Sequence, residues 1–228
     1  MNKIIRCIFL ILGVVLLCGC SRKDDILYRE LTMAQLDGGS FRTDGGKTFQ
    51  VVEQYSDLDL SGTGRYLILC DVLRSDRRSA SDIYDVRLID YFSVLVKDVC
   101  TAATLPSEDA AADDPVAVVR AWSAGGYLNL RVAVEALPES KVQHRVNLVY
   151  DAARSHADTL FFDLRHNAQG EVPTEETGHK YVLSMGYCSF PVSDLLPASG
   201  RAPVLTVRGN WYVSEDPGVT KPWQISVR

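Results

Sequence analysis

The stretch that decides the fold is YLNLRVAVE, residues 127–135. Leucine or valine fills every even-numbered position from Leu128 to Val134, and the polar Asn129 and Arg131 stand between them. Alternation of this kind predicts a β-strand with one face in a hydrophobic core and the other face outside it.

The same pattern continues on both sides of this stretch. Further strands are expected at residues 116–122, 142–150, 159–165, 181–192, 203–213 and 223–227. About seven strands, each with one apolar face and separated by turns, are typical of an antiparallel β-sandwich. We therefore predict a sandwich domain over residues 116–228.

The first half of the chain also has a β pattern, in residues 31–105. Strands are expected at residues 65–73, 84–89 and 91–99, and glycine pairs after Asp37 and Asp44 are turn signals. Short strands in close succession, without a sustained helical period, predict a small barrel or a meander. Between the halves, residues 106–115 (PSEDAAADDP) are acidic and alanine-rich, which predicts a linker and a domain boundary.

The N-terminus carries an export pattern. Basic residues precede an apolar run at residues 7–18, which is too short to span a bilayer comfortably as a helix. The run ends in LCGC, residues 17–20, which resembles a bacterial lipobox. The resemblance implies that residues 1–19 are a signal peptide, that Cys20 is lipidated, and that residues 20–30 form a tether. An ordinary signal peptide or a buried strand is the alternative.

The residues just after the expected anchor give a second indication of location. Lys23, Asp24 and Asp25 resemble the surface-export signals of lipoproteins in the Bacteroidetes, whereas the alternative is a solvated linker. We expect an outer-membrane protein held by its lipid, and the three residues favour exposure at the cell surface.

The charge of the chain limits its partners. The formal net charge is −5, and it becomes −7 when Lys3 and Arg6 leave with the signal peptide. Such a chain has no general attraction for nucleic acid or anionic membranes, so a protein or a glycan is the better expectation for a partner. Exposed aromatic residues such as Trp122, Tyr127 or Trp211 could stack on sugars, although such residues are more often part of a core or sheet face.

Three cysteines remain after Cys20, namely Cys70, Cys100 and Cys188. They form no CxxC pair, so neither a zinc site nor a thioredoxin-like site is expected. Cys70 and Cys100 are candidates for a disulfide, because an exported protein meets oxidants. Two buried thiols in separate strands are an equal alternative, and the role of Cys188 is left open.

Sequence motifs for chemistry are absent. The chain has no GxSxG, HExxH, Walker or EF-hand motif, and we assign no catalytic, metal-binding or cofactor-binding residue. His144 is expected to be a hydrogen-bonded core residue rather than a ligand. The run 165–167 (RHN) is either a polar cluster at a binding surface or, as we favour, a set of partners for backbone groups. His156 and His179 have no assigned partner.

Several segments of the second half carry a family resemblance. They are GGYLNL at 125–130, His144 with NLV at 147–149, LRHN at 164–167 and SFPVS at 189–193. With the lipobox and the β-rich first half, they resemble the NigD-like lipoproteins of the Bacteroidetes over essentially the whole mature chain.

The resemblance implies an all-β chain with an N-terminal OB-like barrel and a C-terminal antiparallel β-sandwich. It implies a cell-envelope location but no established chemistry, and the family name comes from an association with a bacteriocin operon. The resulting expectation is a lipid-anchored protein that binds a partner and catalyses nothing, without a cofactor. A surface glycan-binding lipoprotein is the first alternative, and a hydrolase is the second.

Overall fold

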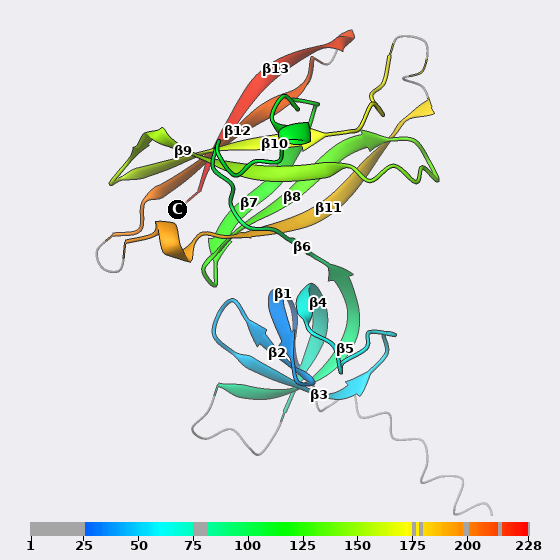
Figure 1. The fold of residues 1–228 in the computed structure, drawn as a ribbon. Coiled ribbons are helices and arrows are strands. Elements are labelled where there is room, and N and C mark those ends of the chain that lie inside the picture. Colours follow the sequence, from blue (N-terminus) through cyan, green and yellow to red (C-terminus); the bar gives the residue numbers. More distant parts are fainter. Residues whose placement is uncertain are drawn as a thin grey trace, which may run out of the picture.

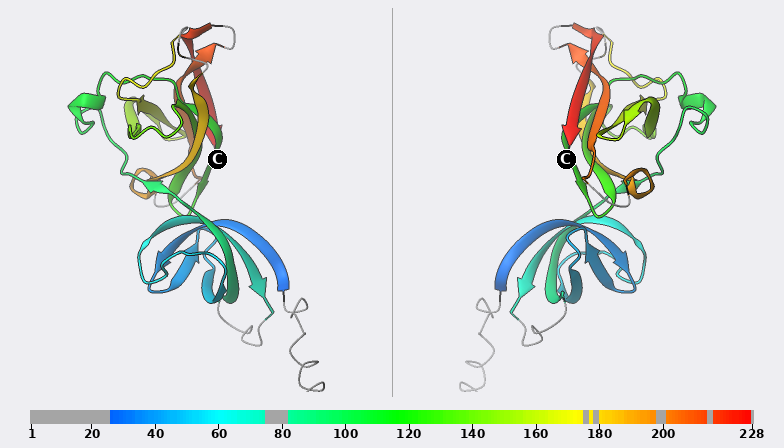
Figure 2. Two further views of the ribbon diagram at one scale, coloured as in Figure 1. Left: turned by 90° about the vertical axis from the view of Figure 1, so that its right-hand side faces the viewer. Right: turned by 90° about the vertical axis from the view of Figure 1, so that its left-hand side faces the viewer.

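The computed structural model describes residues 26–74, 82–174, 177, 180–197, 201–213 and 216–227. These residues form a small barrel and a β-sandwich stacked end to end (Figures 1 and 2). Cys20, the triplet 23–25 and His179 lie outside the described residues. In the part of the chain that is described, no helix has the length and apolarity to cross a membrane.

The barrel is closed and contains five strands. They are β1 (Ile26–Asp37), β2 (Ser40–Thr43), β3 (Thr48–Gln54), β4 (Gly64–Leu73) and β5 (Ile83–Ser93). Their order around the barrel is β1-β2-β3-β5-β4, with β3 and β5 parallel. This is the small closed barrel of the OB type, and it confirms the predicted fold class for the first half.

The barrel interior is filled by side chains that alternate along these strands. Phe41, Phe49, Ile68 and Leu88 are fully buried there. The ring of Phe41 meets that of Tyr66 edge to face, with 6.3 Å between the ring centres. Closure of the sheet leaves no free edge among these strands, so the barrel is a folded unit of its own.

The predicted tether, residues 20–30, is wrong over residues 26–30, because these residues form the start of β1. Glu30 is opposite Cys70 in the ladder with β4, and Tyr28 packs against the barrel core. Arg29 donates from Nε to Oδ1 of Asp71 over 2.7 Å. Half-buried and exposed side chains alternate over residues 26–30, as in a strand that covers the barrel with one face.

The sandwich consists of two four-stranded sheets. One has the order β6-β11-β8-β7, from β6 (Leu95–Val96), β11 (Val182–Pro191), β8 (Tyr127–Ala136) and β7 (Ala117–Ala124). The other has the order β13-β12-β10-β9, from β13 (Asp216–Val227), β12 (Val204–Val213), β10 (Thr159–Asn167) and β9 (Arg145–His156). Leu130, Leu148, Phe162 and Phe190 fill the space between the sheets.

Most pairings are antiparallel, as predicted, but two are parallel. β10 pairs with β12, and β6 pairs with β11, in parallel. The first arises because β11 lies in the opposite sheet, so the chain crosses over and returns beside β10 in the same direction. A short 3-10 turn, η4 (Ser193–Leu195), follows β11.

The chain passes from barrel to sandwich near Val94, not at residues 106–115. The expected strand 91–99 is divided, since Ser93 ends β5 and Leu95 begins the sandwich strand β6. Cys100 then forms a bridge with Val149 of β9. The predicted boundary of the barrel domain at residue 105 is therefore about ten residues too late.

The predicted acidic linker is instead packed on the sandwich. It contains the 3-10 turn η2 (Ser107–Asp109), and only 1% of Asp109 is exposed. The Asp109 carboxylate accepts hydrogen bonds from Arg145 Nε (2.9 Å), Asn147 Nδ2 (2.9 Å) and Asn167 Nδ2 (2.8 Å). The acidic residues of the segment 106–115 thus accept hydrogen bonds from donors on β9 and β10, which explains why the segment is ordered.

The predicted disulfide between Cys70 and Cys100 is not formed, because both thiols are free. Cys70 lies in the barrel core, whereas Cys100 pairs with the sandwich. Cys188 is also free and lies in the sandwich core. Burial raises the pKa of Cys70 and of Cys188 to about 12, so both thiols stay protonated near neutral pH.

Replacement of Asp109 tests the role of this segment. Asp109→Ala should lower the free energy of unfolding by about 1–3 kcal/mol, because it leaves buried donors without an acceptor. Burial would raise the Asp109 pKa, but hydrogen bonds from Asn167 and Asn147 and the charge of Arg145 lower it on balance. The stabilisation is therefore full above the ordinary carboxyl pKa near 4 and is lost as the pH falls through the lower folded value.

Urea unfolding at neutral and acid pH measures both effects. Glu108→Ala is the matched control. The Glu108 side chain is 58% exposed, and the substitution removes the same charge one residue away from Asp109. The control should stay within about 0.5 kcal/mol of the parent. Equal losses in the two variants would show that the segment is only a tether.

Candidate binding cleft between the barrel and the sandwich

The junction of the two domains is built on one buried arginine. Arg65, at the start of β4, donates from Nη2 to Asp44 Oδ2 (2.6 Å) and to Asn129 Oδ1 (3.0 Å). Its Nε donates to Ser189 Oγ over 2.9 Å. Asp44 belongs to the barrel, whereas Asn129 and Ser189 belong to β8 and β11 of the sandwich. The guanidinium thus joins the domains through hydrogen bonds and an ion pair.

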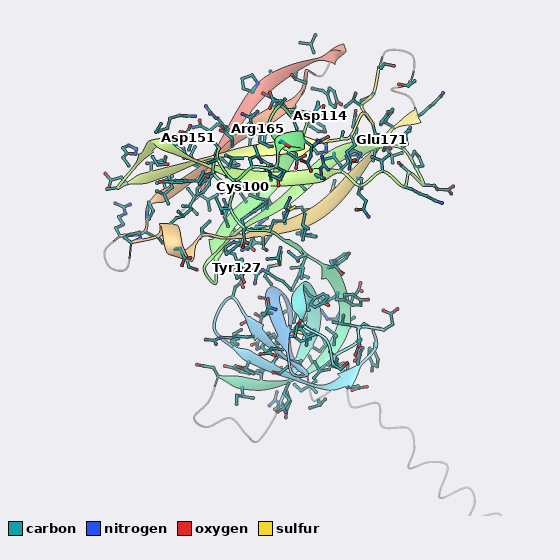
Figure 3. All side chains as sticks on the ribbon, viewed as in Figure 1. Cys100, Asp114, Tyr127, Asp151, Arg165 and Glu171 are labelled. Atoms are coloured by element: carbon teal, nitrogen blue, oxygen red, sulfur yellow. The ribbon has the colours of Figure 1, made fainter. Side chains whose placement is uncertain are left out.

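The hairpin between β7 and β8 closes over this arginine. Its two-residue turn is Gly125–Gly126, and both have positive φ (60° and 82°), which a two-residue hairpin of this type requires. A Cβ on Gly125 would lie 2.6 Å from Asp44 Oδ1, so the turn needs glycine to approach the barrel. Tyr127, labelled at the junction in Figure 3, places its ring 4.0 Å from the Arg65 guanidinium carbon.

Apolar side chains complete the junction beside Arg65. Met33, Leu67 and Val94 are buried in a small cluster of their own, with Trp122 and Tyr187 packed against it. The first two come from barrel strands and the last two from sandwich strands. Polar and apolar contacts together hold the barrel against the outer face of the β6-β11-β8-β7 sheet.

A cavity of about 370 Å³ opens between the two domains at this junction. Leu31, Met33 and Leu67 line it from the barrel. Its sandwich side is the outer face of β7, β8 and β11, and the residues there are Arg120, Trp122, Ala124, Arg131 and Tyr187. We call this cavity the interdomain cleft.

Two arginines give the interdomain cleft its charge. The Arg120 guanidinium lies 5.3 Å from the Trp122 ring centre, and that of Arg131 lies 5.8 Å from the Tyr187 ring centre. Arg131 donates from Nη2 to the thioether of Met185 over 3.1 Å, and its buried Nε has no hydrogen-bond partner in the described structure. Among the described residues of the lining, the one carboxylate is that of Asp44, which is already paired with Arg65.

The aromatic residues considered for sugar stacking have three different positions. Trp122 lines the interdomain cleft, and Tyr127 packs on Arg65. Trp211 lies against Tyr212, with 5.2 Å between ring centres. Sequence reasoning did not single out Arg120 and Arg131. The signal for Arg131 was its position on the outer face of residues 127–135.

Two of the histidines, His144 and His166, form a second polar cluster, at β9 and β10 of the sandwich. His166 is 2% exposed, and its Nδ1 lies 2.8 Å from the carbonyl of Pro115. Its Nε2 lies 3.0 Å from Nδ1 of His144. His144 precedes β9, and its Nε2 is 3.4 Å from Oε1 of Glu171. Glu171 also accepts from the backbone of Leu137 (2.8 Å) and from the Ser140 hydroxyl.

These contacts agree with the structural interpretation of the run 165–167. His166 and Asn167 bond to the carbonyls of Pro115 and Glu108, while Arg165 lies 3.5 Å from Asp113, so all three hold the segment 106–115. His156 is exposed beside the Thr159 carbonyl. Among the described residues, no group of three or more metal-ligating side chains is placed to hold an ion.

Comparison with known proteins now gives the family. Residues 99–215, just over half of the chain, match the model of the NigD-like C-terminal beta sandwich domain. The chain belongs to the NigD-like family. No match was found among the curated proteins.

Solved structures share the fold of this NigD-like chain. A NigD-like immunity protein from Bacteroides caccae is 19% identical, with a TM-score of 0.64 over 86% of this chain and 91% of its own. A protein of unknown function from Bacteroides vulgatus is 20% identical (TM-score 0.64; 87% and 90% covered). A candidate lipoprotein from Bacteroides fragilis is 13% identical (TM-score 0.61; 88% and 97% covered). At these identities the likeness shows the fold alone.

Replacement of His166 tests the structural interpretation. His166→Ala should lower the free energy of unfolding by about 1–3 kcal/mol near neutral pH, because the Pro115 carbonyl and His144 lose their partner. Burial, and then the charge of His144, lower the His166 pKa. A lowered histidine pKa means that the unfolded chain takes up the proton first, so this stabilisation declines as the pH falls below about 6.5.

Urea unfolding of the full chain at pH values above and below about 6.5 measures the loss of unfolding free energy, which should be smaller at the lower pH. His156→Ala, at an exposed histidine, is the control and should change little at either pH. An unchanged unfolding free energy in His166→Ala would contradict the interpretation.

Proposed function

We propose that this NigD-like chain is a lipid-anchored protein of the cell envelope that acts by binding a partner and not by catalysis. The observation that carries this proposal is the interdomain cleft. It presents Arg120 and Arg131 beside aromatic rings, with the buried Nε of Arg131 left without a partner in the described structure. Unused donors beside aromatic side chains in a concave site suit recognition of another molecule.

The proposed anchor is Cys20, at the end of the lipobox-like LCGC. The candidate lipoprotein from Bacteroides fragilis, which shares the fold, supports this assignment. The first described strand begins at Ile26, at the end of the barrel away from the sandwich (Figure 2). An anchor before Ile26 therefore leaves the sandwich and the interdomain cleft on the side turned away from the lipid.

The proposed location is the outer membrane, with Lys23, Asp24 and Asp25 carrying the protein to the outer face. The form of binding that we propose is an immunity role, in which the chain blocks a toxic protein at the envelope. Its support is the shared fold of the NigD-like immunity protein from Bacteroides caccae. A surface glycan-binding role is the second candidate, because Trp122 lines the interdomain cleft and could stack on a sugar ring.

Replacement of Cys20 tests the anchor. Cys20→Ser should move the full chain out of the membrane fraction and abolish labelling by palmitate, since stable anchoring needs two acyl chains or an equivalent second signal. Cell fractionation with metabolic labelling measures both. Cys100→Ser, at a free cysteine in the sandwich half, is the control and should keep the membrane location.

Membrane retention with palmitate uptake in Cys20→Ser would contradict the anchor. In the same cells, protease accessibility of the Asp24→Ala/Asp25→Ala variant tests the export signal. Accessibility equal to that of the parent would show that these two residues are only part of a tether.

A further inference from the structure

The pairing of β7 with β8 places two positive charges directly opposite each other. In the ladder Arg120 is the partner of Arg131, and the register shifts around Val119 just before this pair. Like charges at directly opposed positions destabilise a sheet. The fold itself gains nothing from this arrangement, so the pair is better explained by a ligand than by stability.

The surroundings of this pair do not neutralise it. Among the described residues neither Arg120 nor Arg131 makes an ion pair. Asp44, the carboxylate of the lining, gives its Oδ2 to Arg65 at 2.6 Å. Within the described ranges, the one hydrogen-bond acceptor for Arg131 is the thioether of Met185, and thioethers accept weakly. The cleft therefore keeps a positive charge that a bound anion would neutralise.

The rim around this charge is apolar on both domains. Leu31 of the barrel is 59% exposed, Phe92 is 51% exposed, and Met185 of β11 is 50% exposed. The Phe92 ring lies 6.2 Å from the Tyr187 ring in the cleft wall. Large exposed apolar side chains grouped around a polar centre are typical of a protein-binding surface.

We propose that the interdomain cleft binds an extended segment of a partner protein in which an acidic residue lies between apolar residues. A glutamate or aspartate of the segment would accept bonds from Arg120 and from Nε of Arg131, while apolar residues on either side would cover Leu31, Phe92 and Met185. Arginine suits the recognition of a carboxylate because its planar guanidinium can donate two parallel hydrogen bonds to the carboxylate and can also stack on an aromatic ring. This proposal rests on the proposed binding function and names the chemistry of its partner.

The charge of the rest of the chain favours an isolated acidic residue over a polyanion. The whole sequence has a formal net charge of −5, which repels nucleic acid or a highly acidic surface at long range. A single carboxylate between apolar side chains meets little of this repulsion. A sugar would use Trp122 but would leave the two guanidinium groups without an anion.

Selection from a displayed library of random linear peptides, on the immobilised full chain in detergent, tests the proposal. Selected peptides should carry Asp or Glu between apolar residues. Labelled copies should lose at least about tenfold in affinity, by fluorescence anisotropy, for the variant Arg120→Gln/Arg131→Gln, because two charge-assisted bonds are removed. Free acetate should not displace them.

The control variant is Arg154→Gln, since Arg154 also packs on an aromatic ring, 4.4 Å from that of Phe161, but lies outside the cleft lining. It should bind the peptides like the parent. The double variant should melt at the same temperature as the parent or higher, because the opposed charges are gone. That readout separates a ligand site from a structural pair.

The proposal is overturned by an absence of peptide binders, by peptides without acidic residues, or by equal affinity for the double variant and the parent. Displacement by acetate alone would also overturn it, because a small carboxylate would then suffice. These failures differ from a failure of the anchor, since the selection uses detergent-solubilised protein and needs no membrane.

Discussion

The burial of the Arg65 guanidinium at the junction is the constraint on which the rest of the structure depends. A buried charge is costly unless it is paired and hydrogen-bonded, and Arg65 has all three of these partners only when the two domains meet. Asp44 neutralises it from the barrel, and Asn129 and Ser189 of the sandwich accept further hydrogen bonds from its Nη2 and Nε. Small movements of one domain against the other would leave a buried donor without a partner. The relative position of the domains is thus set by specific bonds.

The interdomain cleft follows from that position. The barrel covers one end of the outer face of the β6-β11-β8-β7 sheet, and the opposed Arg120 and Arg131 stand at the edge of the covered area. On a sheet without the barrel, the same arginines would lie on an open surface in full contact with water. Beside the barrel Arg131 is partly buried, which strengthens its attraction for an anion, and Arg120 stays exposed to an incoming partner. The sequence motifs assign no chemistry to this fold, and its best candidate site forms where the two domains contact each other.

Local patterns were sufficient to predict the strands but not the contacts between distant segments. The alternation of residues 127–135 predicted β8, and the resemblance implied the barrel and the sandwich that the structure confirms. The segment 106–115 was expected to be a linker because its acidic side chains could be hydrated or could bind buried donors. The local sequence is the same in both cases. The partners of Asp109 lie 36 to 58 residues further along the chain. The pairing of Arg120 with Arg131 could not be predicted from local patterns either, because it depends on a register shift between β7 and β8.

Calorimetry of the full chain tests the central claim most directly, by comparing the parent with Arg65→Met. The account predicts one cooperative transition in the parent. In the variant it predicts two separate transitions for barrel and sandwich, with a total loss of about 3–5 kcal/mol, because Asp44 is left buried without its partner. Arg42→Met, at an exposed arginine of the barrel, should melt like the parent. A single, unshifted transition in Arg65→Met would contradict the account.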